Sequence, residues 1–247
     1  MSRRNNILGS IINPLSLSPS LWIDFGDAST ITIGTGVSQI NDKSGFGRNY
    51  TQGLSFFQPL LISGALNGRS VAEFDGINDD LILGTNGLLK NLAGATIMMV
   101  RKWNVVPTTG QVLFKIANNA FAGRAQIQGG NVANKNAVGG RTLDSDSFVR
   151  VDSAANATTN WRVQTGVFDY ANTDLHQYIG DTLDGTTTSF QTATTTSNTD
   201  STSSSIGSGN GAAYASCRIA EILVFPSVLS ATNFSDMLGF FNNKWGV

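Results

Sequence analysis

The last thirty residues, Arg218 to Val247, constrain the fold of this chain more than any other stretch. They begin with a β-branched, apolar run that predicts a buried strand over residues 218–225. Pro226 ends this strand because proline has no N–H for a neighbouring strand. Ser230 and Gly246 then predict the two caps of a short helix. One face of that helix collects large apolar side chains at a 3.6-residue period, namely Phe234, Met237, Leu238, Phe241 and Trp245. We therefore expect the helix to close against a sheet.

The composition indicates a neutral, polar β protein. The chain has 247 residues, a length that a single β-sandwich often reaches. Its net charge is -1 and only 13% of its residues are charged, about half the usual share of a soluble domain. Such a surface offers no basic patch for nucleic acid and no positive field for a membrane. We expect neither partner.

Cys217 is the only cysteine, which excludes an intrachain disulfide and a multi-cysteine metal site. Arg3 and Arg4 are followed by an apolar run, but Asn13 and Pro14 interrupt it and no small-residue cleavage site follows. No apolar stretch approaches the length of a membrane span. The sequence therefore predicts a chain without a signal peptide that is made and kept in a host cytoplasm, or released from one by lysis rather than by secretion.

Residues 1–19 differ from the rest of the chain and are predicted to form an N-terminal arm. Their apolar residues recur at near-helical spacing between two prolines: Ile7, Leu8, Ile11, Ile12 and Leu15. Two interpretations are open, a tail that packs on its own domain and an arm that docks on another subunit. We favour the arm, which implies docking to partner proteins or a homo-oligomer. Residues 20–247 are predicted to form one domain.

The middle of the chain is predicted to form a series of short strands. They are expected at residues 21–25, 37–40, 56–62, 70–74, 81–83, 95–103, 111–116, 125–128, 148–151, 160–168 and 175–180. Strands 95–103 and 111–116 are predicted to pair across a turn, and Asp184-Gly185 to form a hairpin turn. Residues 186–209 are rich in Thr and Ser, with Phe190 and Ile206 as apolar anchors, and are predicted to form strands of an outer sheet.

Four motifs in this order resemble the laminin G-like, concanavalin A-like jelly roll. They are Leu-Trp-Ile-Asp with Asp-Ala-Ser (21–29), Val-Ser-Gln-Ile-Asn-Asp-Lys-Ser-Gly (37–45), Glu-Phe-Asp-Gly-Ile-Asn-Asp (73–79), and the segment from Ala-Glu-Ile-Leu-Val-Phe to Asn-Lys-Trp-Gly (220–246). The resemblance covers residues 20–247. It implies an all-β, two-sheet antiparallel jelly-roll sandwich with one short C-terminal helix. Domains of this variety occur in bacterial surface proteins and in bacteriophage particle proteins.

The sequence gives no support for catalysis. Glu73 and Glu221 are the only glutamates, and neither lies in the alternating Glu-x-Asp-x-x-Glu pattern of jelly-roll glucanases. We expect Glu221 to be a strand residue at the polar end of a sheet. His176 is the only histidine, and no Gly-x-Ser-x-Gly elbow accompanies it. The chain also lacks the ligands of a histidine-based zinc site. We predict no catalytic residues.

Calcium is the one metal for which the sequence offers candidates. The loop residues Asp75, Asn78, Asp79 and Asp80 supply several hard oxygen atoms close together. A turn in which these side chains bond their own backbone explains the same residues, and we favour it. No other cofactor is expected.

Sugar binding needs exposed aromatic rings beside amide and carboxylate groups. Four rings lie near predicted loop ends with such groups nearby: Trp103, Trp161, Tyr170 and Tyr214. Each also suits packing in a core or at a sheet edge, so we assign no ligand-binding residue.

Together, these features predict a non-enzymatic structural protein of a bacteriophage virion, used for decoration, as a fibre or for adhesion. Its lectin-like fold suits a cell-surface glycan, and residues 1–19 would bind other virion proteins. Two alternatives are a bacterial carbohydrate-binding module and a polysaccharide hydrolase on the same fold.

Overall fold

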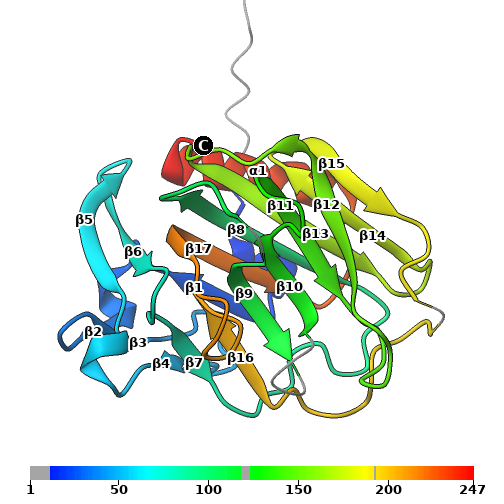
Figure 1. The fold of residues 1–247 in the computed structure, drawn as a ribbon, viewed down its shortest axis with the longest axis horizontal. Helices are drawn as coiled ribbons and strands as arrows, with labels where there is room; N and C mark the ends of the chain where they lie inside the picture. The colour runs from blue at the N-terminus through cyan, green and yellow to red at the C-terminus, as the bar shows by residue number, and fades with distance from the viewer. Residues whose placement is uncertain (1–11, 109, 118–122, 192) are drawn as a thin grey trace, which may run out of the picture.

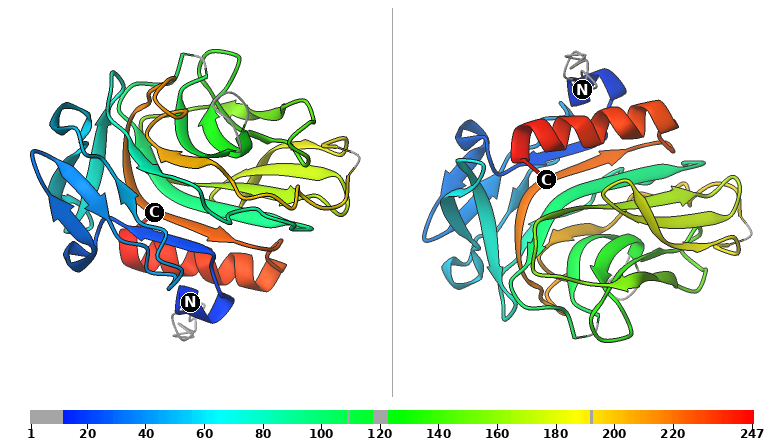
Figure 2. Two further views of the ribbon diagram at one scale, coloured as in Figure 1. Left: turned by 90° about the horizontal axis from the view of Figure 1, so that it is seen from below. Right: turned by 90° about the horizontal axis from the view of Figure 1, so that it is seen from above.

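The computed structural model describes residues 12–108, 110–117, 123–191 and 193–247. It contains two antiparallel sheets packed face to face and one α-helix, α1 (Ala231–Trp245), which covers the outer face of one sheet (Figures 1 and 2). The predicted all-β sandwich with a C-terminal helix is therefore confirmed.

The first sheet has eight strands. Seven of them follow the order β15 (Thr182–Thr187), β14 (Asp174–Ile179), β13 (Arg162–Asp169), β8 (Ala95–Trp103), β17 (Ser216–Phe225), β6 (Arg69–Asp75) and β5 (Leu60–Leu66). The eighth, β1 (Leu21–Asp24), pairs with β17.

The second sheet has nine strands. Their order is β12 (Val149–Asn156), β11 (Lys135–Gly140), β10 (Gly123–Gly129), β9 (Val112–Ala117), β16 (Ser203–Ile206), β7 (Leu81–Leu83), β4 (Tyr50–Thr51), β3 (Val37–Ile40) and β2 (Ile31–Ile33). Three short 3₁₀ helices join the strands of the N-terminal half: η1 (Pro14–Leu17), η2 (Ala28–Thr30) and η3 (Ser55–Phe57).

Strand β17 is the centre of the eight-stranded sheet. One edge pairs with β8 along most of its length, from Cys217 opposite Trp103 to Phe225 opposite Thr96. The other edge is shared, because residues 216–219 pair with β6 and residues 221–224 pair with β1. The strand ends at Phe225, directly before Pro226, as predicted. Two segments from the N-terminal third of the chain thus depend on this C-terminal strand for their position.

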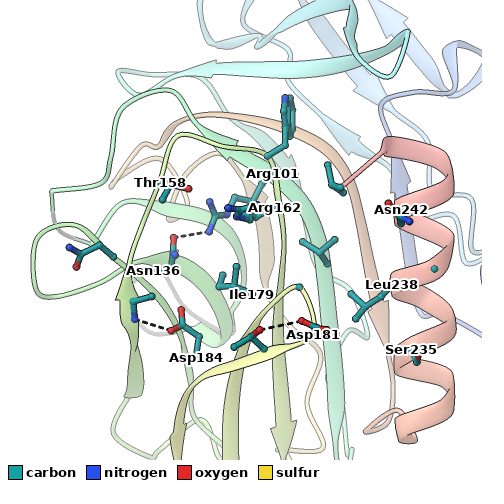
Figure 3. Close-up of a pocket in the computed structure, with 18 residues that line it drawn as sticks. Arg101, Asn136, Thr158, Arg162, Ile179, Asp181, Asp184, Ser235, Leu238 and Asn242 are labelled. Carbon is teal, nitrogen blue, oxygen red and sulfur yellow. Dashed lines mark hydrogen bonds between the residues drawn. The ribbon is translucent and has the colours of Figure 1, made fainter. Parts of the chain in front are cut away.

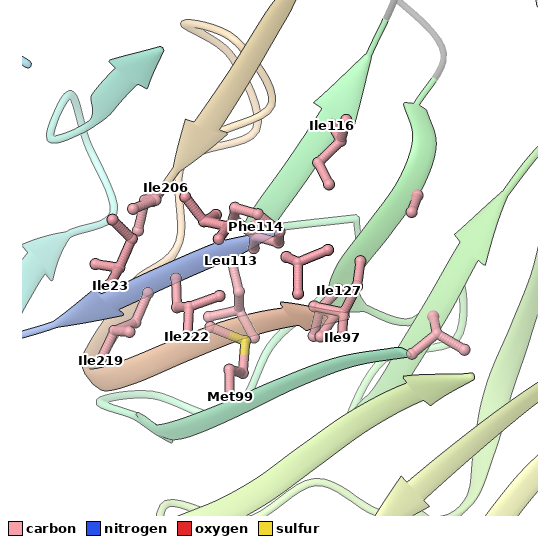
Figure 4. Close-up of a cluster of buried hydrophobic side chains, with 14 of the residues drawn as sticks. Ile23, Ile97, Met99, Leu113, Phe114, Ile116, Ile127, Ile206, Ile219 and Ile222 are labelled. Carbon is pink, nitrogen blue, oxygen red and sulfur yellow. The ribbon is translucent and has the colours of Figure 1, made fainter. Parts of the chain in front are cut away.

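The main core lies between the two sheets (Figure 4). Strand β8 shows how alternation divides the side chains between faces: Ile97, Met99 and Trp103 point into this core, whereas Met98 and Val100 point toward α1. Phe190 and Ile206, the two anchors of the Thr/Ser-rich region, are fully buried. By the same alternation, Arg101 lies on the inner face of the sheet together with Met99 and Trp103.

Helix α1 lies along the outer face of the eight-stranded sheet (Figure 2), and a second apolar cluster joins the two. Met237, Phe241 and Trp245 are buried there, and Phe234 and Leu238 pack at its border. The predicted caps are present: the Ser230 side chain accepts a hydrogen bond from the Asn233 N–H, and Gly246 adopts a left-handed conformation with φ of 72°. The predicted helix and its apolar face are therefore confirmed.

Three local predictions are wrong. Strands β8 and β9 do not pair, because β8 belongs to the eight-stranded sheet and β9 to the nine-stranded one. Asp184 and Gly185 lie inside β15, and the hairpin turns instead at Gly180, whose φ is 63°. The Thr/Ser-rich region forms an interior strand only at β16, which lies between β9 and β7, while most of residues 188–202 run as loop. Each error concerns pairing, which local propensity does not encode.

The predicted arm is only partly described. Residues 1–11, and with them Ile7, Leu8 and Ile11, lie outside the described residues. Ile12 and Leu17 pack against the cluster under α1, whereas Leu15 is 45% exposed. The end of the segment therefore packs on its own domain, and docking through residues 1–19 stays a prediction.

Candidate functional site

A pocket of about 830 Å³ opens where one end of the sandwich meets α1 (Figure 3). Its volume is within the range of about 300–1,000 Å³ usual for ligand sites. The walls come from segments far apart in the sequence: β8, β11, the β12–β13 connection, the β14–β15 turn and one side of α1. From α1, Ser235, Leu238 and Asn242 face the pocket at helical spacing.

Arg101 forms the inner end of this pocket and is fully buried. Its Nε donates a 2.8 Å hydrogen bond to Gln164 Oε1. Its Nη2 donates one of 2.7 Å to Asn136 Oδ1 (Figure 3). Asn136 Oδ1 also accepts a 2.9 Å bond from the indole of Trp103. Gln164 Nε2 donates in turn to Gln177 Oε1 at 3.1 Å. The guanidinium is therefore held in one orientation by a buried amide network.

Nothing among the described residues neutralises Arg101. It takes part in no ion pair, and its Nη1 is buried without a hydrogen-bond partner within the described part of the chain. Burial lowers the pKa of Arg101 to about 9, and the nearby positive charge of Arg162 contributes in the same direction. A buried arginine without a carboxylate is energetically unfavourable and is most often found where a ligand or network compensates it.

The other side of the pocket carries acceptors and an aromatic ring. Asp181 is exposed beside the β14–β15 turn, and Asp184 is buried, with its Oδ1 accepting a 2.9 Å bond from the Ala155 N–H. Half-buried Trp161 also lines the pocket, and it packs against the cluster under α1. Thr158 and Asn156 add further polar groups. The pocket thus combines a ring, hydroxyl and amide groups, two carboxylates and a buried cation.

Of the four rings considered for sugar binding, the structure brings only Trp161 to this pocket. Trp103 and Tyr170 are fully buried, and Tyr214 is half-buried elsewhere. Sequence reasoning missed Arg101, Asn136 and Asp184. One signal was available for Arg101, because it continues the apolar run of Met98, Met99 and Val100 on a strand with no acidic residue.

The candidate calcium loop is an Asx turn in this structure. Oδ1 of Asp75 accepts hydrogen bonds from the N–H groups of Ile77, Asn78 and Asp79 at 2.8, 3.1 and 3.3 Å. Asp79 Oδ2 accepts from the Asp75 N–H at 3.0 Å, and Asp80 accepts from Gln52 and Ser208 at 2.6 and 2.8 Å. These oxygen atoms therefore already have protein donors, as the alternative interpretation expects. Calcium binding itself stays untested.

Glu221 is a strand residue, as predicted, but the predicted position at the polar end of a sheet is wrong. It lies in the middle of β17 and is fully buried, because its carboxylate receives three donors. Trp22 Nε1 and Lys244 Nζ donate to Oε1 at 2.6 and 2.9 Å, and Trp245 Nε1 donates to Oε2 at 2.5 Å. Burial raises the pKa of Glu221, Asp24 adds to this, and Lys244 opposes it. This cluster fastens β1, β17 and α1 together and does not line the pocket.

Other candidates for chemistry are absent from the described ranges. No three His, Cys, Asp or Glu side chains gather there in a way that would hold a metal ion. Across the same residues, no helix combines the length and apolarity that a membrane span requires. His176 faces the neighbouring strand, with its Nδ1 at 2.7 Å from Thr186 Oγ1.

No family model and no curated protein matches this sequence. Solved structures do match its fold. The chain is similar to the botulinum neurotoxin serotype D binding domain (TM-score 0.63, 10% identity), covering 92% of this chain and 51% of that one. It is also similar to the binding domain of Paraclostridial Mosquitocidal Protein 1 (TM-score 0.64, 11% identity), covering 92% and 53%. A third match is the botulinum neurotoxin type G receptor binding domain (TM-score 0.58, 12% identity), covering 90% and 51%.

At such identities the likeness establishes the fold alone. This chain spans about half the length of those structures. The two-sheet sandwich is thus a fold shared with domains described as binding domains.

Proposed function

We propose that this chain is a non-catalytic binding domain that recognises a cell-surface glycan in the pocket between α1 and the end of the sandwich. The observation that carries the proposal is that Trp161 lines the same pocket as the hydroxyl group of Thr158 and the carboxylates of Asp181 and Asp184. An aromatic face suits the C–H face of a sugar ring, and the acceptors suit its hydroxyl groups. The fold shared with toxin binding domains supports the proposal.

The test is a glycan array followed by calorimetric titration of the best glycan. Trp161→Ala should weaken binding at least tenfold, because the ring supplies the apolar platform. Phe56→Ala is the matched control, since Phe56 is 86% exposed and lies outside the pocket. Thermal unfolding of each variant separates lost binding from lost folding. If a folded Trp161→Ala variant binds the glycan as tightly as the wild type, the glycan does not bind at this pocket. If no glycan on the array binds, the remaining hypothesis is a purely structural role for the domain.

We also propose that the domain is a component of a bacteriophage particle, where it serves decoration, as a fibre or in adhesion. The laminin G-like resemblance and the polar Ser/Thr-rich composition support this. Mass spectrometry and immunogold labelling of purified particles test it directly. A chain found only on bacterial cells would favour a carbohydrate-binding module instead.

Attachment through residues 1–19 is part of the same proposal. Removing residues 2–18 should abolish incorporation into particles or change the oligomeric state measured by light scattering. Unchanged assembly would contradict the docking role.

Hydrolysis of a polysaccharide is the third hypothesis, and the arrangement of the carboxylates gives it little support. Asp181 and Asp184 lie at the pocket, but both glutamates are engaged elsewhere, Glu73 with Arg218 and Glu221 under α1. Release of reducing ends from a host polysaccharide, abolished by Asp184→Asn, would establish the enzyme.

A further inference from the structure

We infer that the pocket selects an acidic saccharide, with Arg101 receiving the carboxylate of the sugar. This inference rests on the glycan-binding role proposed above and adds the class of ligand. It is carried by one relationship: Arg101, a fully buried guanidinium whose Nη1 has no hydrogen-bond partner within the described residues, lines the same pocket as Thr158, Asp181 and Asp184.

No carboxylate among the described residues neutralises the charge on Arg101, although the centroid of the Trp103 ring lies 5.6 Å from its guanidinium carbon. Its Nε and Nη2 are used by neutral amide oxygens, which orient the group without neutralising it. The two acidic residues that line the pocket already accept hydrogen bonds, Asp184 from the Ala155 N–H and Asp181 from the Thr182 hydroxyl at 3.2 Å. A ligand carboxylate at Nη1 would remove the imbalance through a charge-assisted hydrogen bond.

The positions of the other groups favour a sugar acid over a simple anion. Figure 3 shows Arg101 and Arg162 at one side of the pocket and Asp181 and Asp184 at the other. A small inorganic anion would reach the arginine side and leave the aspartates without a role. A saccharide of two or three rings spans both sides, with its carboxylate at the arginines and its hydroxyl groups at the aspartates. The pocket volume of about 830 Å³ accommodates a ligand of this size.

The decisive experiment uses pairs of ligands that differ in the carboxylate. The full-length protein is titrated with sialyllactose against lactose, and with a galacturonate tetramer against the same tetramer after its carboxyl groups are reduced to hydroxymethyl groups. At least one acidic member should bind tenfold or more tightly than its neutral partner. Because this comparison uses the wild type, it does not depend on whether a variant folds.

Two variants then assign the preference to Arg101. Arg101→Met should reduce the preference for the acidic member to less than threefold. Arg69→Met removes the same charge from an exposed position outside the pocket and should leave the preference intact. If Arg101→Met does not fold, protection of the Arg101 Nε resonance, or its shift in NMR spectra on adding the acidic ligand, replaces it.

The outcomes separate the two proposals. Equal binding of acidic and neutral members would overturn the inference and leave the glycan-binding proposal standing. If neither the acidic nor the neutral ligands bind, both the inference and the glycan-binding proposal are overturned. An equal loss in Arg101→Met and Arg69→Met would overturn the inference by showing attraction to net charge rather than recognition in the pocket.

Discussion

The indole Nε1 of Trp245 donates a 2.5 Å hydrogen bond to Oε2 of Glu221, which joins the last turn of α1 to the middle of β17. The same carboxylate accepts from the indole of Trp22 on β1. Lys244 bridges Glu221 and Asp24 at 2.9 and 2.8 Å. Glu221 therefore joins the N-terminal strand β1 and the C-terminal helix α1 to the middle of the sheet. Removing its carboxylate should lower the stability of the domain.

Glu221→Gln should destabilise the domain by about 3–5 kcal/mol, the usual cost of breaking a buried ionic group. A glutamine has only one acceptor oxygen, so its NH₂ group must face a donor. Glu73→Gln is the control, because Glu73 pairs with Arg218 at a site where both side chains are about 30% exposed. It should cost less than about 1 kcal/mol. Chemical denaturation of both variants measures the difference, and equal losses would contradict the fastening role.

Phe241→Asp should leave the domain unfolded. Phe241 is fully buried in the cluster between α1 and the sheet, and a carboxylate there would have no donor to compensate its desolvation. The expected loss of more than about 4 kcal/mol is close to the whole stability of a domain. Asn243→Asp, on the exposed side of the same helix, should change stability by less than about 0.5 kcal/mol. Circular dichroism shows whether each variant is folded. A folded Phe241→Asp variant that only loses partner binding would contradict the prediction and indicate that α1 is a docking helix.

Asp79 should make the domain less stable as the pH rises. Burial raises the pKa of Asp79 to about 6, and the charges of Asp75, Asp80 and Glu73 add to this. Because the folded-state pKa is above the unfolded value, the folded state binds the proton more tightly. The stability that protonated Asp79 contributes is therefore fully present below about pH 4 and is lost as the pH rises through about 6.

Asp79→Asn should remove that dependence, since its oxygen still accepts the Asp75 N–H. The variant should gain about 1–3 kcal/mol over the wild type between pH 4 and pH 7. Unfolding curves at both pH values measure the gain, with Asp236→Asn on the exposed surface of α1 as control. A constant difference across the range would show that Asp79 does not titrate in this window.

Calcium should not stabilise the loop from Asp75 to Asp80. The Asp75 carboxylate already accepts three backbone N–H groups, so binding a cation would require these bonds to be exchanged. We expect melting temperatures in millimolar calcium and in chelator to agree within about 1 °C, because a ligand that does not bind the folded state leaves its stability unchanged. Asp75→Ala should still lower stability by about 1 kcal/mol through the lost turn bonds. A calcium-dependent rise that Asp75→Ala abolishes would establish a metal site.

The sequence alone determined the local elements whose signals are periodic. Alternation predicted β1, and a β-branched, apolar run predicted β17. The 3.6-residue spacing from Phe234 to Trp245 predicted α1 and its buried face, and Ser230 and Gly246 predicted its caps. These signals suffice because each records which side of one element is apolar. The resemblance of the four motifs to a jelly roll also implied the two-sheet sandwich, which the structure confirms.

Only the tertiary structure decided which strands pair and what the pocket contains. Strands β8 and β9 are consecutive in sequence but belong to different sheets, because pairing depends on distant partners rather than on the strand itself. Arg101, Trp161, Asp184 and Ser235 meet at one pocket although they come from four separate segments. Glu221 shows the same limit: its pattern is that of a strand residue, and its burial follows from indoles that lie 199 and 24 residues away. Periodicity is local, whereas compensation of a buried charge is a property of the assembled fold.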